Sequence, residues 1–153
     1  IVVRLVGSEM CIRDRIKDLP HGELNLCLLL VVIVLTDSLA YFGGRKFGKT
    51  PLAPGISPKK TREGSLCGTV GSMIFGSVIA VNWLEFSWPM ALLLTFLISV
   101  LGQVGDLVES KMKRLCGVKD SGKVLPGHGG ILDRLDSFLL TTPFFYYWML
   151  LIA

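Results

Sequence analysis

Residues 105–136 read G-D-L-V-E-S-K-M-K-R-L-C-G-V-K-D-S-G-K-V-L-P-G-H-G-G-I-L-D-R-L-D. This stretch is polar, basic and rich in glycine, and it separates two strongly apolar segments. It begins beside Asp106 and ends with Asp133 and Asp136. A polar stretch between apolar segments predicts a chain that crosses a membrane. We expect its acids to hold a metal ion and its basic residues to hold phosphate at the membrane edge.

The composition also favours a membrane protein. Hydrophobic residues make up 51% of the 153 residues and the mean hydropathy is +0.59, whereas a soluble domain needs more polar surface around its core. The formal net charge of +4 suits phosphates or anionic lipid head groups as partners. Nucleic acid is not expected as a partner, because the sequence has no basic stripe interleaved with aromatic residues and no finger or recognition-helix motif.

Four apolar segments predict the fold class. They cover residues 24–44, 66–84, 88–108 and 137–153. About 20 helical residues, at about 1.5 Å each, cross a bilayer core of about 30 Å. We therefore expect an all-α polytopic membrane protein with about four transmembrane helices and two cytoplasmic polar loops. Glycines in the second segment favour close helix packing in lipid: Gly64, Gly68, Gly71 and Gly76.

The basic residues predict the orientation of the chain. They gather in two loops, residues 45–63 and 105–136, and the turn between the second and third apolar segments has none. Alternating spans put both loops on the same side of the membrane. This is the positive-inside pattern, so we expect both loops in the cytoplasm and the protein in the inner (plasma) membrane.

Residues 1–23 do not fit this pattern. The string S-E-M-C-I-R-D-R at residues 8–15 resembles translated sequencing-adapter read-through, so we expect this segment to be partly non-native. A native amphipathic lead-in is the alternative. The basic residues of the segment would face outward unless further spans precede it, so missing upstream spans are also expected.

Several acids recur at helical spacing. Asp106 and Lys113 share one face of a helix that leaves the membrane, and either Glu109 or Ser110 lies on that face as well. Asp133 and Asp136 share a face at the start of the fourth segment. With Asp106 nearby, each pair of carboxylates 4 Å apart would repel by about 4 kcal/mol at an effective dielectric of about 20. A hard divalent cation such as Mg²⁺, bound by carboxylates and substrate phosphates, would relieve this repulsion.

Asp37 lies inside the first apolar segment. A carboxylate there is costly unless it faces a polar cavity or a partner, so Asp37 is a functional candidate. A place at the head-group boundary or a capping role is the alternative.

The loop at residues 45–63 contains three prolines, which forbid a continuous helix. It also contains S-P-K-K-T at residues 57–61, where two ammonium groups stand beside two hydroxyls. Lys59 and Lys60 could grip phosphate oxygens there. An ordinary cytoplasmic loop that meets anionic lipid fits the composition equally well.

The glycine-rich run G-H-G-G at residues 127–130 has a backbone that can approach a ligand closely and offer N–H groups to an anion. Beside the lysines and aspartates, it favours a nucleotide phosphate site. His128 could act as an acid, a base or a phosphate donor, and packing within the loop is the alternative.

These motifs together resemble one known family. The long run from Ser110 to Asp136, which includes S-K-M-K-R, K-D-S-G and L-P-G-H-G-G-I-L-D-R-L-D, looks like the signature of phosphatidate cytidylyltransferases (CDP-diacylglycerol synthases). D-S-L-A-Y-F-G-G at residues 37–44 and S-P-K-K-T resemble two further family motifs, in the same order. The resemblance covers residues 24–153, which look like the membrane-embedded catalytic region, the carboxy-terminal half of such an enzyme. The additional amino-terminal spans that are usual in the family are absent here.

The resemblance implies transfer of the cytidylyl group of CTP to phosphatidate, giving CDP-diacylglycerol and pyrophosphate. It implies Mg²⁺ on Asp106, Asp133 and Asp136, and a second cation is an option. Asp37 would lie beside the metal or bind it. The implied catalytic residues are Asp106, Lys113, Asp133 and Asp136. The implied substrate-binding residues are Ser57, Lys59, Lys60, Ser110, Arg114, Lys119, Lys123, His128 and Arg134. A homodimer is a further expectation.

Two other classes of protein stay open. A CDP-alcohol phosphotransferase would carry D-G-x-x-A-R followed by G-x-x-x-D, and this sequence has no such run. An ion-coupled transporter would place acids and broken helices near the middle of the membrane. Here the three aspartates lie at the ends of predicted spans, which favours the enzyme.

Overall fold

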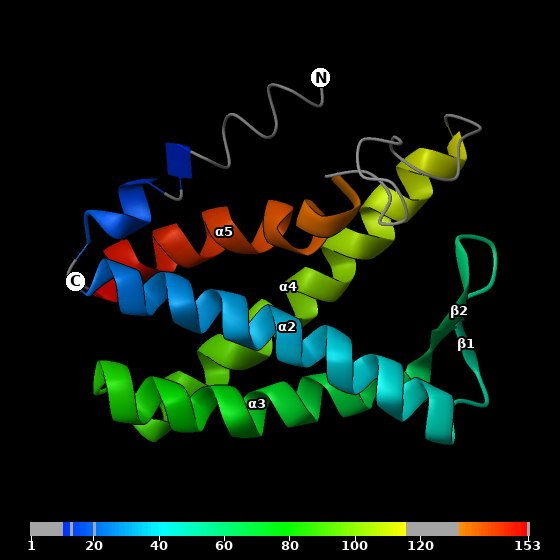
Figure 1. Cartoon of the computed structure of the whole chain (residues 1–153), viewed down its shortest axis with the longest axis horizontal. Coiled ribbons are helices and arrows are strands. Elements are labelled where there is room, and N and C mark those ends of the chain that lie inside the picture. The colour runs from blue at the N-terminus through cyan, green and yellow to red at the C-terminus, as the bar shows by residue number, and fades with distance from the viewer. Residues whose placement is uncertain (1–10, 13, 20, 116–131, 153) are drawn as a thin grey trace.

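The computed structural model describes residues 11–12, 14–19, 21–115 and 132–152, and Figure 1 shows their arrangement. The helices are α2 (Gly22–Phe47), α3 (Arg62–Leu84), α4 (Trp88–Leu115) and α5 (Leu132–Ile152). Two short strands, β1 (Pro51–Ala53) and β2 (Ser57–Thr61), lie between α2 and α3. The predicted all-α fold class is confirmed, because long helices form nearly all of the described chain.

Three of the described helices, α2, α3 and α4, are long and apolar enough to cross a membrane by length and composition. They contain the first three predicted apolar segments in full. The fourth predicted segment is also helical, but its apolar part, Ser137–Ile152, is shorter than the other three spans. The whole of α5 has 21 residues, which gives a length of about 32 Å.

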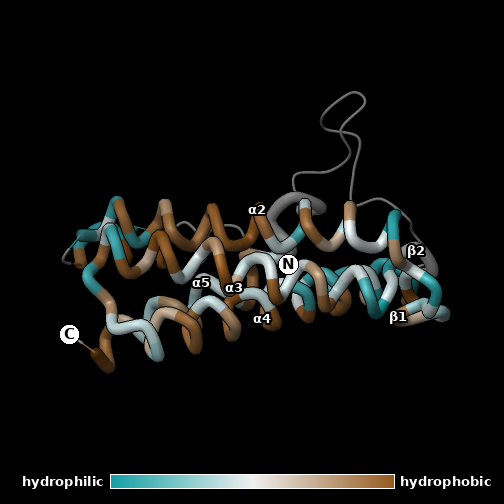
Figure 2. The backbone as a smooth tube through the Cα atoms, turned by 90° about the horizontal axis from the view of Figure 1, so that it is seen from below, coloured by the Kyte–Doolittle hydropathy of each residue, from teal (hydrophilic) through white to brown (hydrophobic). Residues whose placement is uncertain are grey.

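The outer faces of the helices carry large apolar side chains. On α2 and α3 these include Leu30, Val34, Leu66, Val70, Ile74 and Phe75, all more than 45% exposed. So much exposed apolar surface is unusual for a soluble protein and suits contact with lipid. Figure 2 shows the apolar middle stretches of the helices and the polar residues at the end that carries β1 and β2.

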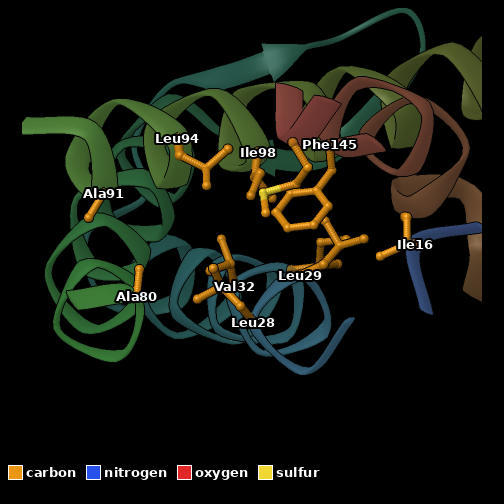
Figure 3. Packing of buried hydrophobic residues seen from close by; sticks show 11 residues of the cluster. Ile16, Leu28, Leu29, Val32, Ala80, Ala91, Leu94, Ile98 and Phe145 are labelled. Carbon is orange, nitrogen blue, oxygen red and sulfur yellow. The ribbon is translucent and has the colours of Figure 1, made fainter. Parts of the chain in front are cut away.

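The buried core lies toward the end of the bundle opposite the hairpin. Phe145 of α5 packs among Leu29 and Val32 of α2 and Leu94 and Ile98 of α4 (Figure 3). All five side chains are at most 2% exposed. This cluster therefore fixes the position of α5 against α2 and α4.

Helices α2 and α3 approach closely because glycines line their contact. A Cβ atom at Gly64 would lie 2.6 Å from the carbonyl oxygen of Ala40, and one at Gly68 would lie 2.6 Å from that of Thr36. Any side chain at these positions would push the helices apart. The close packing predicted from the glycines of the second segment is confirmed.

Helix α5 runs back along α4 (Figure 1). A Cβ atom at Gly102 of α4 would lie 3.8 Å from the Cβ of Ser137 and 3.7 Å from the Cγ2 of Thr141 on α5. This contact sets the register of the two helices. Positions after Gly102 on α4 therefore lie opposite positions before Ser137 on α5.

The segment predicted as a basic loop folds instead into an antiparallel hairpin. Pro51 pairs with Thr61 and Ala53 pairs with Ser57, with a register irregularity between the two pairs. Pro51 is tolerated because it is the first residue of its strand. The prolines exclude a helix, as predicted, but they do not exclude these short strands.

Candidate functional site

A cavity of about 520 Å³ lies where α2, α3, α4 and the hairpin meet. Its polar lining includes two acids and two basic residues, Asp37, Asp106, Arg45 and Lys60. The other lining residues are Ala40, Tyr41, Gly44, Leu52, Ser57, Thr61, Ser65 and Gln103. The cavity thus combines opposite charges with apolar patches at one end of the membrane helices.

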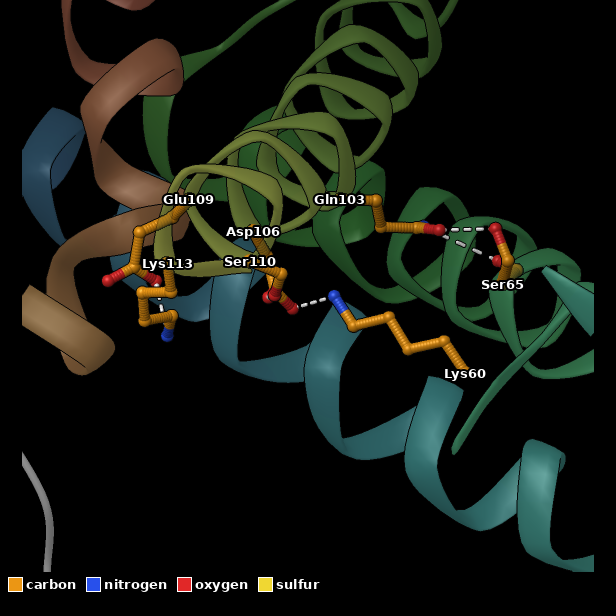
Figure 4. A network of polar contacts seen from close by, with 7 residues as sticks. All are labelled: Lys60, Ser65, Gln103, Asp106, Glu109, Ser110 and Lys113. Carbon is orange, nitrogen blue, oxygen red and sulfur yellow. Dashed lines mark hydrogen bonds and ion pairs between the residues drawn. The ribbon is translucent and has the colours of Figure 1, made fainter. Parts of the chain in front are cut away.

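An ion pair lies in the wall of this cavity. The ammonium of Lys60, on β2, donates a hydrogen bond to Oδ2 of Asp106, on α4 (Figure 4). The two side chains are 30% and 27% exposed, so solvent screens the pair only in part. The hydroxyl of Ser110 lies 3.4 Å from Oδ1 of Asp106 and donates to it. Asp37 of α2 faces the same cavity.

Glu63 fixes the base of the hairpin that carries Lys60. Its carboxylate accepts hydrogen bonds from the backbone N–H groups of Lys49 and Thr50, both at 3.2 Å, and from the Thr50 hydroxyl at 2.6 Å. Thr61 caps α3, because its hydroxyl oxygen accepts from the backbone N–H of Gly64 at 3.2 Å. These bonds hold both ends of the hairpin against α3. The position of Lys60 on β2 is therefore restricted.

A polar network continues from the cavity into the helix bundle. The side-chain amide of Gln103 donates to Thr69 at 2.9 Å. The side-chain oxygen of Gln103 accepts from the hydroxyl of Ser65, as Figure 4 shows. Ser99 lies 3.4 Å from Thr69 and 3.1 Å from Thr36, so the network joins α2, α3 and α4. Polar groups at such depth must find partners within the protein. The network therefore fixes the rotation of α4 that points Asp106 at Lys60.

A second ion pair lies on α4, beyond Asp106. Lys113 donates to Oε2 of Glu109 at 3.2 Å. The helical spacing predicted that either Glu109 or Ser110 shares a helix face with Asp106. In the structure Ser110 bonds to Asp106, and Glu109 bonds to Lys113 instead (Figure 4).

The structure brings four of the predicted site residues together at the cavity: Asp37, Ser57, Lys60 and Asp106. Ser110 and Lys113 follow Asp106 along α4, and Arg114 is exposed in its last turn. Asp133, Arg134 and Asp136 lie in the first turns of α5, but their side chains, like that of Lys59, lie outside the described part of the structure. Lys119, Lys123 and His128 lie outside the described residues altogether.

The described residues include no group of three or more acids, histidines or cysteines that could hold a metal ion. The predicted site also needs Asp133 and Asp136, whose side chains are not among those described. The donors that are described fit a hard cation, because Asp37 and Asp106 supply carboxylate oxygens to one cavity. The ammonium of Lys60 already meets the charge of Asp106.

Two polar residues of α4 that take part in these contacts were not predicted as site residues. Gln103 lines the cavity, and Glu109 is buried beside Lys113. Both lie in or at the end of an apolar helix, where polar groups are costly. The same signal selected Asp37 and could have selected these two.

The fold and the cavity together define a polytopic membrane protein with a charged site at one end of its helices. A family model described as "Cytidylyltransferase family" matches residues 2–152, and the chain belongs to this family. The resemblance that the motifs indicated is thereby confirmed.

Three curated relatives of this chain are each named phosphatidate cytidylyltransferase. The chain is 51% identical over 118 residues to the phosphatidate cytidylyltransferase of Helicobacter pylori, covering 77% of this chain and 44% of that protein. It is 51% identical over 134 residues to that of Bacillus subtilis, covering 87% and 50%. It is 46% identical over 140 residues to that of Synechocystis, covering 89% and 46%. The chain thus spans about half the length of these relatives.

Proposed function

We propose that this chain forms the catalytic region of a phosphatidate cytidylyltransferase, which transfers the cytidylyl group of CTP to phosphatidate. The observation that carries the proposal is the charged cavity at one end of the membrane helices, where Lys60, Asp106 and Asp37 meet. The names of the relatives support the same activity.

The reaction asks for positioning and charge neutralisation. A phosphate oxygen of phosphatidate attacks the α-phosphorus of CTP, the bond from that phosphorus to the bridging oxygen breaks, and pyrophosphate leaves with the electron pair. Phosphoryl transfer of this kind needs little covalent chemistry from the protein. Lys60 and Arg45 supply positive charge at the cavity wall. This charge would stabilise a phosphate group bound in the cavity.

The position of the cavity suits a lipid substrate. Its volume lies within the usual range of small-molecule sites, about 300–1,000 Å³. Ala40, Tyr41 and Leu52 give it an apolar part beside the charged groups. A phosphatidate head group could enter this cavity while its acyl chains stay in the bilayer, since the outer helix faces are apolar.

We propose that Asp106, Asp133 and Asp136 hold Mg²⁺, with Asp37 beside it. When bound, the cation would neutralise phosphate charge and orient the triphosphate. The register of α4 and α5 supports this set. Asp106 comes one turn after Gly102 on α4, and Asp133 comes one turn before Ser137 on the antiparallel α5, while Gly102 and Ser137 are in contact. A second cation stays a prediction.

The ammonium of Lys60 would bind either the carboxylate of Asp106 or a phosphate of the substrate. Its ammonium binds Asp106 in the structure, and a phosphate that enters the cavity would offer a competing anion. We expect Lys60 to exchange one for the other, because a flexible four-carbon chain lets an ammonium re-aim at low cost. Lys113 and Arg114 would meet the triphosphate from the end of α4.

We also propose that both polar segments face the cytoplasm, in the inner membrane of the cell. The hairpin and the end of α4 lie at the same end of the bundle, as the Lys60–Asp106 pair requires. That arrangement supports the positive-inside assignment. A homodimer stays a prediction.

A labelled-CTP assay in membranes tests the activity. The chain is expressed alone, and in a second arm it replaces the matching region of the Bacillus subtilis relative. Formation of labelled CDP-diacylglycerol that requires phosphatidate is expected in at least the second arm. Labelling that needs no phosphatidate, or none in either arm, would refute the proposed activity. Asp106→Asn in the same arm should abolish product formation.

A further inference from the structure

Glu109 carries a charge in an unusual place. Among the charged side chains whose burial the structure describes, only that of Glu109 is buried, with 6% of the residue exposed. A carboxylate buried without a partner costs several kcal/mol, so its retention requires compensation. The proposed reaction, as derived above, does not use this residue.

Among the described residues, the compensation comes from one side only. Oε2 of Glu109 accepts from Lys113 at 3.2 Å, and the Lys113 side chain is 18% exposed. Oε1 is buried and has no hydrogen-bond partner among the described residues. The ion pair with Lys113 is thus the described contact that makes burial of this carboxylate tolerable.

The pair lies on the side of α4 that meets α5. Glu109 comes seven residues after Gly102 and shares its helix face, and Gly102 contacts Ser137 and Thr141 of α5. Since α5 runs antiparallel to α4, Glu109 lies toward the first turn of α5. Figure 4 shows Glu109 and Lys113 next to each other on α4, away from the Lys60–Asp106 pair.

We propose that Glu109 is a positioning residue that orients the ammonium of Lys113 toward the triphosphate of CTP. This inference rests on the proposed function. A lysine loses about 2 kcal/mol of rotamer entropy when it is fully immobilised, which is equivalent to about 30-fold in a binding constant. A carboxylate that already orders Lys113 removes part of that loss from the binding step. An ammonium has three N–H donors, so Lys113 can contact a phosphate while it stays bound to Glu109.

The effect should fall on CTP affinity. Immobilising one rotamer-rich side chain costs an amount equivalent to about three- to tenfold in a dissociation constant. Glu109→Gln keeps the shape of the side chain and an acceptor for Lys113 but removes the charge. We expect this variant to bind CTP about three- to tenfold more weakly in the presence of Mg²⁺, with a smaller change in turnover.

The experiment compares four proteins in lipid nanodiscs by CTP calorimetry and thermal unfolding: the parent chain, Glu109→Gln, Lys113→Met and the double variant. The matched control is Glu85→Gln, the same chemical change at an exposed residue in the turn between α3 and α4. Lys113→Met alone should unfold at a lower temperature, because it leaves a buried carboxylate without its ammonium. The double variant should regain that stability but not the CTP affinity.

Together the four proteins form a double-mutant cycle, which distinguishes a positioning role of Glu109 from a packing role. In the Lys113→Met background, Glu109→Gln should no longer weaken CTP binding, whereas a packing role would cost the same in both backgrounds. Parent-like affinity of Glu109→Gln, or an equal loss in both backgrounds, would overturn the inference and leave the proposed function intact. A parent protein that binds no CTP, alone or within the Bacillus subtilis hybrid, would instead overturn both.

Discussion

Lys60 and Asp106 meet at the wall of the cavity although 46 residues separate them in the sequence. Lys60 comes from the hairpin between the first two spanning helices, and Asp106 comes from the third. Their contact brings the two polar segments of the chain to one end of the bundle. It also supplies, within a single cavity, a carboxylate suited to a cation and an ammonium suited to a phosphate.

Replacing Lys60 by Met should lower cytidylyl transfer by about 100-fold, which is the usual loss when one charge-stabilising donor is removed from an active site. The reason is that the variant leaves Asp106 without its ammonium partner and the substrate phosphate without a positive charge at the cavity wall. The rate is measured with labelled CTP in the hybrid enzyme. Lys46→Met, an exposed lysine in the last turn of α2, is the control and should keep the parent rate. Equal rates for the two variants would contradict a role for Lys60.

The spanning helices could be predicted from the sequence because a bilayer imposes a length and a composition on each one. The first three apolar segments accordingly lie inside α2, α3 and α4. The hairpin could not be predicted in the same way. Three prolines exclude a helix, but the strands are short, and their pairing depends on contacts such as that of Glu63 with Thr50.

The candidate site was predictable as a set of residue types but not as a geometry. Asp37 was selected because a carboxylate inside an apolar span is costly, Lys60 because the ammonium groups of S-P-K-K-T suit phosphate, and Asp106 because acids at helical spacing suit a cation. Their meeting in one cavity depends on how α2 and α4 are rotated, which is set by tertiary contacts such as that of Thr36 with Ser99 and that of Gln103 with Thr69. The convergence of Asp106 with Asp133 and Asp136 stays a prediction, since two of these side chains lie outside the described part of the structure.

Replacing Glu63 by Ala should loosen the hairpin. The variant removes the acceptor of the Lys49 and Thr50 backbone N–H groups, so these two amides should exchange with deuterium faster than in the parent. CTP-dependent activity should fall about threefold to tenfold, because Lys60 is then held less firmly. Hydrogen exchange followed by mass spectrometry measures the first effect. Unchanged exchange at residues 49–50 would show that Glu63 does not fix the hairpin.

Gln103→Leu should destabilise the helix bundle by about 1 kcal/mol, the typical scale of a hydrogen bond between membrane helices. The change leaves Thr69 and Ser65 without the amide that now joins α3 to α4. Unfolding in a mixed-micelle titration measures the loss. Leu93→Ala, at a residue 49% exposed on the outside of α4, is the control and should change stability less. A smaller loss at Gln103 than at Leu93 would contradict a structural role for the network.

Gly68→Ala tests the close contact of α2 and α3. A Cβ there would lie 2.6 Å from the carbonyl oxygen of Thr36, well inside van der Waals distance, and backbone on both sides leaves little room to adjust. We expect a loss of about 1–3 kcal/mol in the free energy of unfolding, as is usual for overpacking. Activity should fall as well, because the shift would move Asp37 relative to Lys60.

The same change at Gly55, between the hairpin strands, provides the matched control. A Cβ at Gly55 would meet nothing within 4 Å, so Gly55→Ala should leave the unfolding free energy within about 0.5 kcal/mol of the parent. Both variants are compared with the parent by denaturant titration in the same detergent. Equal stabilities for the two variants would mean that α2 and α3 can separate without loss, and that the glycines of α3 do not fix the cavity.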